Sequence, residues 1–89
     1  MEFRWNAWNL EHATRHGVSP EEAERVVERA RRPYPLHRGD GKWLAVGRGA
    51  AGEFVQVVYL LDPDGATVYV IHARPLTDAE KRRHRRRSK

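Results

Sequence analysis

The sequence contains no cysteine and no long apolar run. Without cysteine, neither a disulfide framework nor a thiolate metal site can form, and an intracellular protein is the simplest interpretation. The longest apolar run, Val57–Leu61, falls far short of the roughly 20 residues of a transmembrane helix. No apolar stretch follows the first charges, as it would in a signal peptide. The sequence therefore predicts a soluble, cytoplasmic protein with no membrane contact.

The length and the distribution of charge define two parts. The 89 residues are enough for one domain, which we expect over residues 1–80. The net charge is +5, but seven of the nine residues 81–89 are Lys or Arg, and the other ten basic residues face twelve acidic ones, so the body carries −2. A basic end is typical of nucleic-acid contact, and a solvated tail is the alternative. The arginines expected to hold RNA are Arg82, Arg83, Arg85, Arg86 and Arg87.

Capping residues predict three helices. Asn6 can cap a helix that runs to about Arg15 and stops at Gly17. Ser19, with Pro20 and Glu22 behind it, forms a capping box for a second helix. The buried stripe of that helix is expected at helical spacing, at Ala23, Val26, Val27 and Ala30. Another capping box, Thr77 with Glu80, starts a last helix that carries the basic run.

The second half of the chain is typical of strands. Val, Tyr, Phe and Trp are frequent in three segments that short turn sequences separate: residues 43–48, 53–61 and 66–74. A further short strand is expected within residues 34–38. The fold class is therefore α+β, with two N-terminal helices packed on a three- to four-stranded antiparallel meander and a short basic C-terminal helix.

Two four-residue hairpin loops would set the register of this meander. Arg48, Glu53 and Arg74 would then form one cross-strand row, with Val46, Val55 and His72 in the next row. His72 and Arg74 share a face by their spacing alone. The register also divides the apolar residues between two faces: Leu44, Val57, Val68 and Val70 on one, and Trp43, Phe54, Val58, Tyr69 and Ile71 on the other. The face away from the two helices would need the last helix, a second copy or a partner protein to cover it.

Two segments resemble a known family. His16–Ala23 (HGVSPEEA) is similar to a helix–turn–helix signature of the BrnT-like proteins, and so is the order of Gly47-Arg48, then Val70–Thr77 (VIHARPLT), then Glu80 and a basic helix. The resemblance implies a RelE-like fold and the toxin of a bacterial type II toxin–antitoxin pair, which cuts RNA and is neutralised by a cognate antitoxin. A homodimer or a toxin–antitoxin hetero-oligomer would follow.

RNA cleavage without a metal needs a base for the 2′-hydroxyl, an acid for the leaving 5′-oxygen, and cations for the phosphate. Arg74 and Arg48 are the candidate cations, and His72 and His84 are the candidate base and acid. Glu53 or Glu80 can act as a base or orient an arginine. We therefore predict a metal-independent endoribonuclease without a cofactor. The alternatives are a non-catalytic module that binds nucleic acid or protein, and a degenerate toxin, because the family often has Tyr in place of His84.

Each candidate also has a purely structural interpretation. Arg74 and Glu53 can be a cross-strand ion pair, His72 a core histidine, and Glu80 only the capping partner of Thr77. His84 can be part of a disordered tail. His12 and His16 lack a third metal ligand. The tryptophans can stack on bases, but we expect core packing for all three, Trp5, Trp8 and Trp43.

Overall fold

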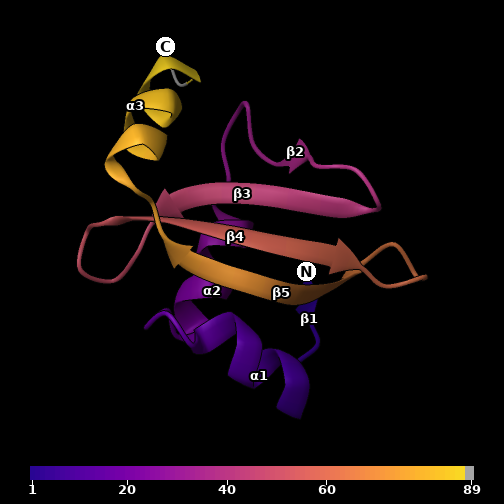
Figure 1. Cartoon of the computed structure of the whole chain (residues 1–89). Helices are drawn as coiled ribbons and strands as arrows, with labels where there is room; N and C mark the ends of the chain where they lie inside the picture. Colours follow the sequence, from indigo (N-terminus) through magenta and orange to yellow (C-terminus); the bar gives the residue numbers. More distant parts are fainter. Residues whose placement is uncertain (88–89) are drawn as a thin grey trace.

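The computed structural model describes residues 1–87. A five-stranded sheet has the order β1-β5-β4-β3-β2, and α1 and α2 lie against it on one side while α3 projects from the end of β5 (Figure 1). The strands are β1 Glu2–Phe3, β2 Leu36–His37, β3 Lys42–Arg48, β4 Phe54–Leu61 and β5 Thr67–Pro75, and the helices are α1 Ala7–Thr14, α2 Pro20–Glu28 and α3 Asp78–Arg87. Among these described residues, no helix is long and apolar enough to cross a membrane.

The α+β class is confirmed, but the predicted sheet is incomplete. β2 to β5 form the antiparallel meander, and β1 adds to its edge in parallel, with Phe3 opposite Val68. The sheet is therefore mixed. A two-residue strand has no period that a sequence pattern can reveal, so its pairing depends on the tertiary contacts around it.

The three predicted helix starts are confirmed. The side chain of Asn6 accepts a hydrogen bond from the backbone N–H of Asn9, and Ser19 accepts one from Glu22. At the last helix, the Thr77 hydroxyl accepts from the Glu80 N–H. Local capping chemistry therefore places every helix. The end of the basic segment, residues 88–89, lies outside the described residues.

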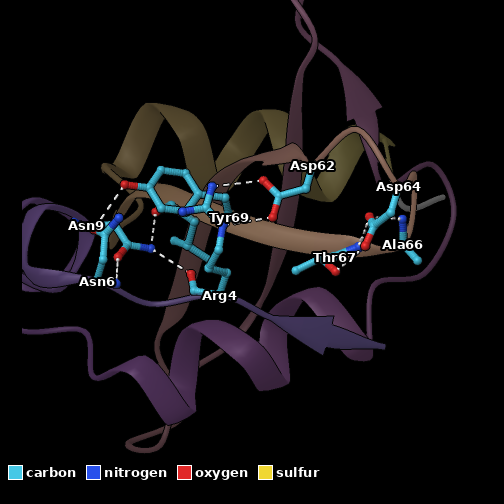
Figure 2. A network of polar contacts seen from close by, with 9 residues as sticks. Arg4, Asn6, Asn9, Asp62, Asp64, Ala66, Thr67 and Tyr69 are labelled. Carbon is cyan, nitrogen blue, oxygen red and sulfur yellow. Dashed lines mark hydrogen bonds and ion pairs between the residues drawn. The ribbon is translucent and has the colours of Figure 1, made fainter.

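A buried amide ties α1 to the sheet. Asn9 has no exposed surface, and its Nδ2 donates to the carbonyl oxygens of Arg4, at 3.1 Å, and of Val70, at 3.0 Å. Its Oδ1 accepts from the backbone N–H of Asn6 at 2.7 Å. These bonds join the N-terminal segment, α1 and β5, as Figure 2 shows. They also satisfy a carbonyl of β5 where its strand partner β1 has ended.

Ion pairing extends this network to the β4–β5 turn. Arg4 donates from Nε and Nη2 to the two carboxylate oxygens of Asp62, at 2.8 and 2.9 Å (Figure 2). The Arg4 guanidinium also lies 4.1 Å from the centre of the Tyr69 ring. The Asp64 carboxylate accepts from the backbone N–H groups of Ala66 and Thr67 and from the Thr67 hydroxyl. The N-terminal segment and the β4–β5 turn therefore stabilise each other.

The predicted register is wrong on both sides of β4. Arg48 pairs with Phe54, which makes the β3–β4 loop five residues long, and Arg74 pairs with Gln56. Glu53 lies in the loop, so the row of Arg48, Glu53 and Arg74 does not form. The second predicted row fails as well, because His72 lies opposite Val58 and not Val55. The causes are two loops longer than four residues and an irregularity of pairing at Val58/Tyr59, and each shifts the alignment beyond it.

The register shift also corrects the two apolar faces. Trp43 packs with Val57, Val68 and Val70 against the helices, whereas Leu44 packs on the other face with Phe54 and Val58. The segment after α2 covers much of that other face, through the buried side chain of Tyr34 and the half-buried Leu36. Helix α3 covers a further part of it, because the His84 ring lies 4.7 Å from the Phe54 ring.

Core packing is confirmed for two of the three tryptophans. Trp5 and Trp43 pack against the main core. Trp8 is 50% exposed and stacks on His12 with ring centroids 3.9 Å apart. Helix α1 packs through the face that carries Asn9 and Ala13, and Trp8 lies outside that buried face.

We expect Asn9→Ala to lower the free energy of unfolding by about 2–4 kcal/mol, because it leaves the buried Val70 carbonyl oxygen without its hydrogen bond and removes two further hydrogen bonds. Asn6→Ala is the matched control. It removes the helix cap and an exposed hydrogen bond from the Tyr69 hydroxyl, but leaves no buried group unpaired, and should cost about 1 kcal/mol. Urea unfolding followed by circular dichroism measures both. Equal losses in the two variants would contradict a special role for Asn9.

Candidate nucleic-acid interface

A cavity of about 400 Å³ lies on the sheet face opposite α1 and α2. Strands β3, β4 and β5 form its floor, and β2 and α3 contribute to its walls. The lining includes four arginines: Arg38 just after β2, Arg74 in β5, and Arg83 and Arg87 in α3. Polar and apolar groups complete it: Tyr34, Leu36, His37, Leu44, Val46, Gln56, Leu76, Glu80 and His84. The site is therefore cationic, and its floor combines apolar side chains of β3 with polar ones of β4 and β5.

One face of α3 supplies part of this lining. Its cavity residues are Glu80, Arg83, His84 and Arg87, which recur at i, i+3, i+4 and i+7 as one helical face does. The arginines predicted to hold RNA therefore divide into two groups. Arg83 and Arg87 line the cavity, whereas Arg82, Arg85 and Arg86 do not.

Arg74 is held by Glu80. Its Nη1 and Nη2 donate to Oε1 and Oε2 at 2.7 Å each, a two-pronged pair. Glu80 Oε1 also accepts from the backbone N–H of Thr77 at 2.8 Å. Glu80 thus both caps α3 and orients Arg74, and the predicted ion pair of Arg74 with Glu53 is wrong. The Arg74 guanidinium and the Thr77 N–H hold the pKa of Glu80 at about 2, so its carboxylate stays charged at neutral pH.

His84 is part of an ordered helix and packs into the cavity wall. Its Nδ1 lies 3.1 Å from the Tyr34 hydroxyl oxygen, and its ring lies 4.7 Å from the Phe54 ring. Burial lowers the pKa of His84, and the charges of Arg48 and Arg87 lower it further. The imidazole is therefore neutral at pH 7 and can accept a proton.

The remaining candidates lie elsewhere. Arg48 donates to the Gly52 carbonyl at 2.7 Å and lies over the Phe54 ring, and it lines a second cavity. Glu53 lines neither cavity. The ring of His72 lies against His16, with centroids 5.4 Å apart, and burial, with the nearby His16 and Arg74, lowers its pKa. The structure thus brings Arg74 and His84 to one cavity and leaves Glu53 and His72 outside it.

Tyr34 was missed by reasoning from the sequence alone. It is buried, lines the cavity and contacts His84. The available signal was an aromatic residue between two prolines directly after the arginine-rich end of α2. Nothing local links that position to His84, which lies 50 residues further along the chain.

Within residues 1–87, no group of three or more His, Asp or Glu side chains could hold a metal ion. His12 Nδ1 lies 2.7 Å from the Trp8 carbonyl oxygen, and His16 lies against His72. His12, in α1, therefore contacts Trp8, and His16, just after α1, contacts His72.

We expect the pKa of His84 to lie below 6.5 in an NMR titration of the imidazole protons. Arg87→Ala should raise it, because a positive charge that disfavours the imidazolium is removed. Arg85→Ala, a neighbour on the same helix that lines no cavity, should leave it unchanged. Equal shifts in the two variants would mean that net charge, and not position, controls His84.

Glu80 should make stability depend on pH at the acid end. Its pKa falls from 4.5 in the unfolded chain to about 2 in the fold, so the unfolded state binds more protons between these values, and stability is lost as pH falls through that window. Other carboxylates contribute there too, so the test is the difference in urea midpoint between the wild type and Glu80→Gln. That difference should be constant from pH 7 to 5 and shrink below pH 4.5. A difference unchanged down to pH 2 would contradict the ion pair.

A comparison of the sequence with protein-family models finds no match, and a search of curated proteins finds no similar sequence. A proposal of function therefore rests on the geometry of this cavity and on the resemblance of short segments to BrnT-like proteins.

Proposed function

We propose that this chain is a metal-independent endoribonuclease, the RelE-like toxin of a bacterial toxin–antitoxin pair. One observation carries the proposal. A single cavity holds a histidine with a lowered pKa, an arginine fixed by a carboxylate, and further arginines around them. These are the parts that phosphodiester cleavage by an internal nucleophile requires.

His84 is the proposed base. When its Nδ1–H donates to the Tyr34 hydroxyl oxygen, Nε2 carries the free lone pair and can take the proton of a 2′-hydroxyl. The 2′-oxygen then bonds to phosphorus, the bond to the 5′-oxygen breaks, and the imidazolium returns its proton to that leaving oxygen. The products are a 2′,3′-cyclic phosphate and a 5′-hydroxyl. Because the nucleophile is a 2′-hydroxyl, the reaction is confined to RNA.

Arg74 is the proposed stabiliser of the charge that builds on the phosphate. Glu80 fixes its guanidinium through both oxygens, so little reorganisation is needed when the transition state forms. Arg83 and Arg87, on the same face of α3, would hold the RNA backbone.

The partners follow from the same site and from the resemblance to BrnT-like toxins. A cognate antitoxin would inhibit by covering the cavity, and the cationic lining fits an acidic segment of such a partner. The two proteins would form a hetero-oligomer in the cytoplasm, and a homodimer of the free toxin is the other assembly that we consider.

A non-catalytic nucleic-acid-binding module is the second candidate. The observation in its favour is that Nη1 and Nη2 of Arg74 already donate to Glu80. The role of Arg74 would then be only to stabilise the start of α3. The arginines of the cavity would then hold phosphate, and no bond would be cut.

The test incubates the purified protein with a mixed single-stranded RNA in EDTA. We expect cleavage, and a fall of about 10²-fold or more in His84→Ala, the usual range for a lost acid–base group. The double variant Arg83→Ala/Arg87→Ala should lose about tenfold or more in kcat/KM. Its matched control is Arg82→Ala/Arg85→Ala, which removes the same charge from the same helix and should change little.

Circular dichroism verifies that each variant is folded. RNA that is retained at low salt but never cut would favour the binding module. Equal losses of kcat/KM in the two double variants would mean that the basic helix contributes only its net charge, and that the position of Arg83 and Arg87 in the cavity does not matter. A protein that neither binds nor cuts RNA would fit a degenerate toxin and would refute the proposal.

A further inference from the structure

A second cavity, of about 500 Å³, adjoins the candidate site. Three residues line both cavities: Tyr34, Val46 and His84. The Tyr34–His84 pair therefore stands in the wall between them. The rest of the second lining comes from the segment that follows α2, through Arg29, Arg31 and Arg32, and from the end of β3, through Gly47 and Arg48.

The second cavity carries positive charge without a carboxylate to balance it. Four arginines line it, and no Asp or Glu does. Among residues 1–87, the ion pairs join Arg4 to Asp62, Arg74 to Glu80 and Lys81 to Asp78, and none involves these four arginines. Like charges around one hollow repel each other, and an anion bound from outside would relieve that repulsion.

The fold holds these arginines by their backbones. Arg29 is the C-cap of α2, and its N–H donates to the Arg25 carbonyl oxygen at 3.0 Å, while the Ala30 N–H donates to the Val27 carbonyl oxygen at 3.4 Å. A turn follows, in which the Tyr34 N–H donates to the Arg31 carbonyl at 2.9 Å. This turn buries Tyr34 against the sheet and leaves the arginines before it exposed. The segment that carries the charge is thus anchored by the same tyrosine that contacts His84.

Arg48 closes the cavity from the side of the sheet. Its guanidinium lies 4.3 Å from the centre of the Phe54 ring, and its Nη1 donates to the Gly52 carbonyl at 2.7 Å. One nitrogen is thus occupied, which leaves the other donors of the planar group for a ligand. The Phe54 ring also packs against His84, so Arg48 and His84 share one supporting ring.

We infer that the second cavity binds the phosphodiester adjacent to the one that is cut, so that a single RNA strand crosses the Tyr34–His84 wall with a phosphate on either side. The inference rests on the proposed function for the position of the cut. Forked guanidinium groups suit phosphate oxygens, and the shared residue His84 is the candidate base, so a strand that reaches it borders both cavities. The substrate class is single-stranded RNA with at least two consecutive phosphodiesters.

The kinetic test compares an RNA octanucleotide with a dinucleoside monophosphate, which can fill only one cavity. For Arg31→Ala/Arg32→Ala we expect KM for the octanucleotide to rise about tenfold with kcat unchanged, and no change for the dinucleoside monophosphate. Arg15→Ala/Arg25→Ala is the matched control, because both side chains are exposed and line neither cavity. Arg31→Lys/Arg32→Lys, which keeps the charge, should restore part of the affinity.

The binding test separates this inference from the proposed reaction. It uses a 2′-O-methyl octanucleotide, which has no 2′-hydroxyl to attack. The slope of log K against log salt should become shallower by about 0.7 in Arg31→Ala/Arg32→Ala, because the loss of one phosphate contact on a single strand removes about 0.7 from the slope. The control pair should keep the wild-type slope.

The outcomes are distinct. If the wild type cuts no RNA but the slope changes as expected, the proposed reaction fails and the phosphate site stands. If the wild type cuts RNA but Arg31→Ala/Arg32→Ala matches the control in KM and slope, the inference is overturned and the reaction stands. An octaglutamate peptide that competes as strongly as the octanucleotide would also overturn it, and would assign the cavity to an acidic protein segment.

Discussion

The buried amide of Asn9 connects parts of the chain that would otherwise be independent. Its two donated hydrogen bonds reach Arg4 and Val70, and its accepted bond starts α1. A buried polar side chain is tolerated only when its hydrogen bonds are formed, so this residue specifies where α1 lies against β5. Once α1 and α2 occupy that face of the sheet, the opposite face is left to the Tyr34 segment and to α3. The candidate site lies on this opposite face.

Charge has a different part on each face. Near the N-terminus, Arg4 is paired with Asp62 and contributes to the fold. Around the two cavities, only Arg74 has a carboxylate partner among the described residues. Burial, and then the charges of Arg48 and Arg87, lower the pKa of His84, which keeps its imidazole neutral beside a surface suited to anions. The positive charge around the two cavities destabilises a protonated His84. The same charge favours a phosphate ligand, which would then lie beside a proton acceptor.

Much of the fold is readable from short segments. The caps at Asn6, Ser19 and Thr77 follow from contacts within a few residues, which is why their prediction is confirmed. Of the predicted stripe of α2, Ala23, Val26 and Val27 are buried, whereas Ala30 lies beyond the end of the helix and is half-buried. Strands β3, β4 and β5 were located within about a residue at each end, because β-branched and aromatic residues mark them. Of the candidate site, Arg74 was placed correctly at the end of a strand before the basic helix, and His84 was identified by residue type alone.

The sequence by itself determined the α+β class, the helix starts and the concentration of arginine in α3, because each depends on neighbours along the chain. Only the tertiary structure decided which partners meet. Loop lengths and the irregular pairing at Val58/Tyr59 shift the sheet register, so Arg74 meets Glu80 and not Glu53. The rotation of α3 decides that Arg83 and Arg87 face the cavity while Arg82 and Arg85 do not. Tyr34 and His84 meet across 50 residues, through packing that no local pattern encodes.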